Sequence, residues 1–143
     1  MRITTRGRYA LRASLALAKL EKEGRPVSIN SLSEQENISS VFLEQIFFKL
    51  RKAGLVSSVR GPGGGFRFAK PLNQISVKEI LDAAGEELDI SNCDKHEPEC
   101  DRIGECLSHN ILLGAHELIM KYFEGITVAA ILEANEEIIQ DIA

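Results

Sequence analysis

The sequence predicts a mainly α-helical fold with one small β-hairpin. Apolar residues recur at helical spacing along most of the 143 residues, and the spacing changes to alternate residues over 55–59 and 66–68. The glycine-rich hexapeptide from Arg60 to Gly65 separates these two runs, as expected for a hairpin loop. No linker rich in proline and serine divides the chain, so an ordinary core is expected.

Three helices are expected before the hairpin, over about residues 5–23, 28–37 and 39–53. Serines accept hydrogen bonds at helix starts, and Gly or Asn adopts the left-handed turn at helix ends. The residues suited to these roles are Gly24, Ser28, Asn37, Ser39 and Gly54. Because three or four residues join the second helix to the third, the pair is a helix-turn-helix, and the hairpin behind it makes a winged helix.

The second half of the chain predicts further helices and one long loop. Ser76 and Glu79 have the capping-box spacing and begin a helix that extends to about residue 84. Residues 91–108 contain proline, glycine and many acids without periodicity, so a loop is expected there. A long helix then runs until Gly125, and Thr127 caps a last helix.

The net charge of −4 conceals an uneven distribution of charge along the chain. Residues 1–70 hold 13 Lys and Arg against 5 Asp and Glu, a net of +8, whereas residues 71–143 hold 4 against 16, a net of −12. A basic lobe is typical of phosphate binding, although a solvated basic face has the same composition. We therefore expect residues 1–72 to be a DNA-binding part and residues 73–143 to complete one compact chain without a flexible linker.

The third helix has the pattern of a DNA recognition helix. Its buried face is predicted by apolar residues at i, i+3, i+4 and i+7, which are Leu43, Ile46, Phe47 and Leu50. On the opposite face, Gln45 suits adenine and Glu44 suits the N4 amine of cytosine. The basic residues that suit phosphates are Lys49, Arg51 and Lys52. Val41 and Phe48 share this face, and we expect Phe48 to pack on a neighbouring element rather than contact a thymine methyl group.

The glycine-rich loop is interpreted as a wing and not as a nucleotide-binding loop. Loops that cradle nucleotide phosphates have a G-x-G-x-x-G pattern or a Walker lysine and lead into a helix, whereas this loop leads into a strand. Arg60 and Arg67 flank glycines that let the backbone approach a duplex closely. Arg60 is therefore a candidate for minor-groove or phosphate contact.

All three cysteines, Cys93, Cys100 and Cys106, lie within fourteen residues, and His109 follows three residues later. Together they are four soft ligands, a full shell for an iron–sulfur cluster or for zinc. The C-x₆-C and C-x₅-C gaps are longer than those of structural zinc sites, and the surrounding acids oppose a free thiolate. The residues alone favour a cluster and leave zinc or a bare thiol switch as alternatives.

Three stretches of the chain resemble the IscR-type winged-helix transcription regulators: residues 2–10 (RITTRGRYA), 43–45 (LEQ) and 50–65 (LRKAGLVSSVRGPGGG). The resemblance covers essentially the whole chain. It implies a homodimer that binds double-stranded DNA at two half-sites and carries an iron–sulfur cluster, [2Fe–2S] rather than [4Fe–4S]. The apolar stripe of the helix over about 107–123 is larger than one small lobe needs, so we expect this helix to be the dimer interface. We further expect a repressor whose DNA binding is controlled by the cluster, sensing iron, redox or nitric oxide status.

The resemblance assigns site residues position by position. Ser39, Glu44 and Gln45 match the recognition helix, and Arg60 matches the wing arginine. The candidate DNA-binding residues are Ser39, Ser40, Glu44, Gln45, Lys49, Lys52, Arg60, Gly63 and Gly64. The candidate ligands are Cys93, Cys100, Cys106 and His109.

Two departures from the family pattern concern the cysteine segment. Its first gap is one residue longer than in the relatives that it resembles most, which predicts a bulge near Pro98, and His96 is an alternative to His109 as fourth ligand. Some relatives take that ligand from an acidic residue near the N-terminus, where this chain has Arg8. This difference favours His109.

The composition disfavours several other classes of protein. No Ser/His/Asp or Cys/His arrangement indicates an enzyme, and no small-molecule substrate is expected. Arg12 and Lys19 interrupt the first apolar run, so we expect a cytoplasmic protein without a signal peptide or membrane span. A small iron–sulfur electron-transfer protein and a zinc-stapled or thiol-based regulator remain as alternatives. A regulator controlled by a partner protein would not need the three cysteines.

Overall fold

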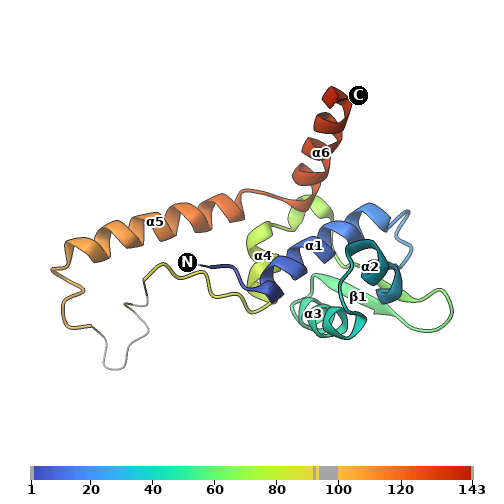
Figure 1. Ribbon diagram of the computed structural model, residues 1–143, viewed down its shortest axis with the longest axis horizontal. Coiled ribbons are helices and arrows are strands. Elements are labelled where there is room, and N and C mark those ends of the chain that lie inside the picture. Colours follow the sequence, from blue (N-terminus) through green and yellow to red (C-terminus); the bar gives the residue numbers. More distant parts are fainter. Residues whose placement is uncertain (1, 92, 94–99, 143) are drawn as a thin grey trace.

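The structure is a winged helix-turn-helix that continues into a long helix and a terminal helix (Figure 1). The computed structural model describes residues 2–91, 93 and 100–142, with side chains up to residue 136. The elements in chain order are α1 (Thr5–Leu20), α2 (Ile29–Glu36), α3 (Ser40–Lys52), β1 (Val56–Val59), β2 (Gly65–Phe68), the 3-10 turn η1 (Leu72–Gln74), α4 (Val77–Ala83), α5 (Leu107–Glu124) and α6 (Val128–Ile142). The predicted helical fold with a two-stranded antiparallel hairpin is confirmed.

Local capping places α2 and the turn after it as the sequence predicts. The Ser28 hydroxyl accepts the Ser31 N–H at 3.1 Å, and Asn37 ends the helix in the left-handed conformation at φ +52°. Three residues, Asn37 included, separate α2 from α3. The predicted cap of α3 is wrong in one respect, because the Ser39 side chain makes no capping hydrogen bond. Its backbone has φ −50° and ψ 131°, against φ −70° and ψ 152° for Ser28, whose hydroxyl does cap its helix.

The first helix ends three residues before its predicted end, because the chain turns to pair with the wing. Glu23 and Gly24 have φ of +55° and +71°, which reverses the chain after α1. Val27 then exchanges two backbone hydrogen bonds of 2.8 Å with Phe66 in β2. This long-range pairing has no local sequence signal, so the helical periodicity alone extends the helix too far.

The main core lies between α1, α2, α3 and the hairpin. Its largest fully buried side chains include Leu17, Leu32, Leu43, Ile46, Phe47 and Leu50. The rings of Phe47 and Phe66 lie 5.0 Å apart, which joins the recognition helix to the wing. A second, smaller cluster places Met120 and Phe123 of α5 against Leu81 of α4. The C-terminal end of α5 is thereby attached to the winged helix.

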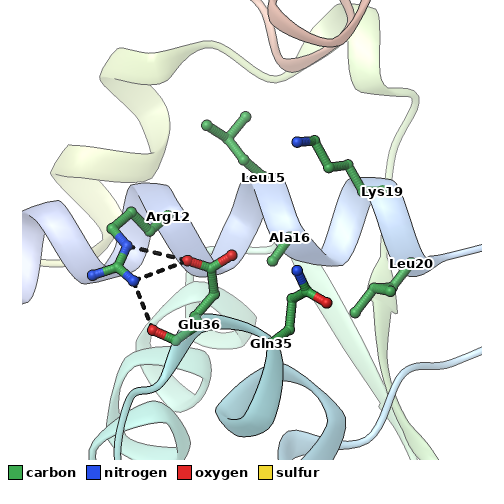
Figure 2. A pocket seen from close by; sticks show the side chains of 7 residues that line it. All are labelled: Arg12, Leu15, Ala16, Lys19, Leu20, Gln35 and Glu36. Atoms are coloured by element: carbon green, nitrogen blue, oxygen red, sulfur yellow. Dashed lines mark hydrogen bonds and ion pairs between the residues drawn. The ribbon is translucent and has the colours of Figure 1, made fainter. Parts of the chain in front are cut away.

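An arginine fixes α1 against the end of α2 (Figure 2). Arg12 Nε donates to the Glu36 carboxylate at 3.1 Å, and Nη2 donates to the Glu36 carbonyl oxygen at 2.6 Å. The pair borders a pocket of about 250 Å³ between the two helices, which Leu15 and Lys19 also line. Because Glu36 is the last residue of α2, these bonds hold the turn from which α3 departs.

The second half of the chain extends away from the wing (Figure 1). Backbone hydrogen bonds of 2.9 Å, from Val77 to Ile126 and from Val128 to Ile75, anchor the start of α6 beside the start of α4. From this anchor α5 extends outward, so its first turn, with Cys106 as its N-cap, lies at the opposite end of the molecule from the hairpin. The division of the chain near residue 72 stays a prediction.

Candidate DNA-binding surface and cysteine loop

The outer face of α3 carries the polar residues that the sequence placed there. Glu44 and Gln45 are exposed, whereas Leu43 and Ile46, beside them in the chain, are buried in the core. The amphipathic pattern therefore orients the helix as predicted. Ser39 and Ser40 lie at its N-terminal end, where the backbone N–H groups of the first turn are unpaired within the helix.

The basic residues at the end of α3 lie in different surroundings. Lys52 is exposed, whereas the half-buried Lys49 approaches Gly85 at the end of α4, where Arg6 Nη2 donates to the Gly85 carbonyl at 3.2 Å. Arg51 Nη1 lies 3.2 Å from the Ser58 hydroxyl on β1. Arg51 thus joins the last turn of α3 to the wing, Lys49 lies beside Gly85 after α4, and Lys52 is exposed to solvent.

The wing has a fixed backbone and an exposed cation. Arg60 is exposed, and the loop closes by a 2.9 Å hydrogen bond from the Gly64 N–H to the Gly61 carbonyl. A Cβ on Gly64 would overlap the Val59 carbonyl oxygen, and Gly63 beside it is exposed with open space around it. The close backbone approach at Gly64 explains why the loop needs glycine there.

The described part of the cysteine loop consists of turns that lead directly into α5. Cys93 and Cys106 are half-buried, Cys100 is exposed, and all three are free thiols. Cys106 occupies the N-cap position of α5. The nearby backbone N–H of His109 lowers the pKa of the Cys106 thiol, although the Cys106 side chain makes no capping hydrogen bond to α5. A helix start therefore favours the thiolate form that metal ligation requires.

His109 lies one turn along α5 from Cys106 and is 92% buried, with 8% of its surface exposed. Its Nδ1 atom is buried and has no hydrogen-bond partner among the described residues. A buried imidazole nitrogen without a partner fits an unfilled ligand role. Among the residues that the structure describes, no three His, Cys, Asp or Glu side chains converge on a metal position. The predictions for His96 and Pro98 lie outside the described residues.

One face of α5 exposes large apolar side chains along the length of the helix. Leu107, Ile111, Leu118 and Tyr122 are 80%, 72%, 71% and 65% exposed. At 3.6 residues per turn these four positions lie within about 60° of one another around the helix. They form a continuous stripe that the described part of the chain leaves uncovered. We call these four residues the α5 stripe.

Sequence reasoning missed one buried carboxylate. Glu86, which follows α4, is 6% exposed and accepts hydrogen bonds from the Thr4 N–H at 2.7 Å and the Thr4 hydroxyl at 2.5 Å. Thr4 is the N-cap of α1, so a residue 82 positions away supports the start of the first helix. No local motif predicts a contact at this separation.

A helix-turn-helix joined to a hairpin wing, with exposed polar residues on its second helix, defines a winged-helix transcription regulator. The chain belongs to the Rrf2 family, described as "Iron-dependent Transcriptional regulator", whose match spans residues 3–134. The family assigns it to transcription regulators, which is not a class of enzymes, in agreement with the prediction. No helix among the described residues is long and apolar enough to cross a membrane.

Named relatives and solved structures support the same family. The HTH-type transcriptional regulator IscR of Aliivibrio salmonicida is 40% identical over 136 residues, covering 95% of this chain and 80% of the relative. The structure of T. potens IscR matches with a TM-score of 0.75 at 31% identity, covering 96% and 90% of the two chains. CymR, the global cysteine regulator of B. subtilis, matches with a TM-score of 0.74 at 28% identity, covering 94% and 98%.

Proposed function

We propose that the chain is a homodimeric, sequence-specific DNA-binding repressor whose affinity for DNA is controlled by an iron–sulfur cluster. The observation that carries the DNA-binding part is the outer face of α3, where Glu44 and Gln45 are exposed beside a core-bound face. A helix of this kind fits the major groove, where Gln bonds adenine and Glu accepts from cytosine N4.

The remaining candidate DNA contacts position the helix. Lys49, Lys52 and Arg60 supply positive charge for phosphates, and Ser39 and Ser40 place hydroxyls and the N-terminal N–H groups of α3 near the backbone. The wing backbone at Gly63 and Gly64 has no side chains to keep a duplex at a distance. These groups orient α3 on the duplex, and the exposed face of α3 contacts the bases.

Dimerisation is proposed through the α5 stripe. Four large apolar side chains on one face of a helix are unfavourable in water, and burying each contributes about 1.5–3 kcal/mol. A second copy of the same helix offers a complementary stripe by two-fold symmetry. Leu118→Glu should produce monomers in light-scattering chromatography, and Glu117→Gln, beside it on the helix, serves as a control. A Leu118→Glu protein that stays dimeric would refute this interface.

The cluster is proposed to be held by Cys93, Cys100, Cys106 and His109. The fit is supported by three free thiols on one loop, the lowered pKa of Cys106, and the unpartnered buried Nδ1 of His109. When bound, an iron–sulfur cluster supplies a group that responds to iron supply and oxidants, with [2Fe–2S] preferred over [4Fe–4S]. The loop leads directly into α5. The proposed ligand Cys106 is therefore adjacent in the chain to Leu107, the first residue of the proposed dimer interface.

The cofactor test is the visible absorption of anaerobically purified wild type and Cys100→Ala, with iron, sulfide and zinc assays. A coloured wild type with equal iron and sulfide, and a colourless variant, are expected. A colourless, zinc-loaded wild type would refute the cluster assignment and leave DNA binding untouched. A metal-free wild type would favour the second candidate, a thiol-based regulator. The exposed thiol of Cys100 supports that candidate, as does the 30% identity to the oxidised form of Staphylococcus aureus CymR.

The DNA-binding test uses a duplex pool with a randomised central segment, from which wild type selects its preferred sites. Arg60→Ala should weaken binding to the selected duplex and reduce the slope of log affinity against log salt by about one. Glu44→Ala should broaden the selected sites, because a carboxylate in the groove repels most sequences. Unchanged slope and unchanged selection would contradict the roles of Arg60 and Glu44 respectively.

A further inference from the structure

Two large apolar side chains lie exposed on the outer face of α3. Val41 is 62% exposed and Phe48 is 55% exposed. At 3.6 residues per turn, Val41, Gln45 and Phe48 lie within about 60° of one another around the helix. Together with Glu44 and Lys49 they line a shallow depression of about 510 Å³ on the helix surface. The apolar side chains therefore flank the two polar residues that are proposed to read bases.

Neither residue contributes to the core. Phe47, the neighbour of Phe48, is fully buried, and Phe42 packs its ring edge-on against Tyr9 at 5.7 Å. The expectation that Phe48 packs on a neighbouring element is wrong, because more than half of it is exposed. Leaving a phenyl ring in water forgoes most of the gain from burial. The exposed Phe48 ring is thus available to contact the surface of a binding partner.

The Phe48 ring is held in place by a cation. The Arg51 guanidinium lies 5.6 Å from the ring centroid, and Arg51 Nη1 is 3.2 Å from the Ser58 hydroxyl on β1. A ring between the helix and a guanidinium tied to the hairpin has limited freedom. It therefore presents a defined apolar surface beside Gln45.

The apolar group that DNA offers in the major groove is the 5-methyl group of thymine, and aliphatic and aromatic side chains contact it. Phe48 lies seven positions after Val41, a rise of about 10.5 Å along the helix. This length corresponds to about three base-pair steps of 3.4 Å. Two methyl groups about three steps apart, with hydrogen-bonding base edges between them, match the order of side chains along α3.

We propose that Val41 and Phe48 determine operator specificity by contacting thymine methyl groups on either side of the bases read by Glu44 and Gln45. This inference rests on the proposed DNA-binding function and adds the base class that the operator must contain. The selected half-site is expected to carry thymines about three steps apart, flanking the positions that Glu44→Ala relaxes.

The test removes methyl groups without altering hydrogen bonding. The duplex selected by wild type is synthesised with each thymine replaced singly by deoxyuridine, and affinity is measured by fluorescence anisotropy. One methyl group is about one buried carbon, so deoxyuridine at a contacted position should weaken wild-type binding about fourfold. Deoxyuridine at other positions should leave the affinity unchanged. Both residues are exposed, so Val41→Ala and Phe48→Ala should fold, as circular dichroism can verify.

Each variant should lose the thymine preference at one position. Phe48→Ala should bind thymine and deoxyuridine duplexes equally at the position that it contacts and keep the preference at the Val41 position, with the reverse for Val41→Ala. Lys52→Ala is the matched control, since loss of a phosphate contact should weaken both duplexes by the same factor. Wild type that binds the selected duplex with no deoxyuridine effect would overturn this inference and leave the proposed function standing. A pool from which no duplex is enriched would overturn both.

Discussion

Gly7, in the first turn of α1, is expected to be intolerant of even a methyl group because of Glu86. A Cβ on Gly7 would overlap Oε2 of Glu86 and lie 2.8 Å from its Cδ. The carboxylate is buried and bonded to both the N–H and the hydroxyl of Thr4. Gly7→Ala must therefore displace the carboxylate and break these bonds.

The size of the effect follows from two opposing contributions. Hydrogen bonds to a charged group contribute about 1.5–3 kcal/mol, which the displaced carboxylate loses. Replacing glycine by alanine in a helix returns at most about 1 kcal/mol. Gly7→Ala should therefore lower the free energy of unfolding by about 0.5–2 kcal/mol. With Glu86→Ala already present, the obstacle is gone, and the same substitution should stabilise the protein by up to about 1 kcal/mol.

The assay is urea unfolding, followed by circular dichroism, of wild type, both single variants and the double variant at one chain concentration. The coupling energy of this cycle should be about 1.5–3 kcal/mol. The Ile3 methyl group, 3.1 Å from the added Cβ, is present in both backgrounds and cancels from the cycle. Glu34→Ala, an exposed carboxylate on α2, is the control and should change stability little. A coupling energy near zero would refute the reasoning.

Three further predictions follow from local geometry. Gly65→Ala, whose Cβ would overlap the Val27 carbonyl oxygen, should destabilise the protein by more than Gly63→Ala, which meets open space; equal unfolding midpoints would contradict this. Arg12→Lys should cost about 1 kcal/mol in the same urea assay, since an ammonium cannot keep both bonds to Glu36; full stability would contradict it. The hydrogen bond from Lys70 lowers the pKa of Glu79. The ionised Glu79 side chain therefore contributes its full stabilisation of the fold at pH values above the usual glutamate pKa. The stability gap between wild type and Glu79→Gln should therefore close as pH falls through the lowered pKa, and a gap independent of pH would contradict it.

Elements of the fold whose limits depend on adjacent residues were predictable from the sequence. Ser28 and the capping box of Ser76 and Glu79 begin helices where predicted, because their hydrogen bonds span three residues. The end of α1 was not predictable, since Val27 pairs with a strand almost forty residues away. Periodicity reports which face of a helix is buried, but not where a tertiary contact ends it.

The candidate site likewise has features that the sequence predicted and features that it did not. The exposure of Glu44 and Gln45 followed from helical spacing, because the buried face of α3 was unambiguous. The exposure of Phe48 did not follow, since an aromatic residue usually finds a neighbour, and its position depends on the way Arg51 reaches the hairpin. The role of Glu86 was also hidden, because a carboxylate in an acidic stretch resembles a solvated one until its distant partner is known.

The placement of the cysteines limits how they can influence α3. The start of α5, where Cys106 is the N-cap, lies at the opposite end of the molecule from the hairpin, and the α5 stripe is largely exposed. Contacts join the second half to the winged helix at several points: Met120 and Phe123 of α5 pack against Leu81 of α4, Val128 of α6 is buried in the main core, and Glu86 bonds to the start of α1. Coupling requires an element with two arrangements that both sites bias, and these contacts lie away from the Cys106 end of α5. A dimer changes this, because pairing of α5 would set the separation of the two recognition helices directly, and α5 starts at Cys106.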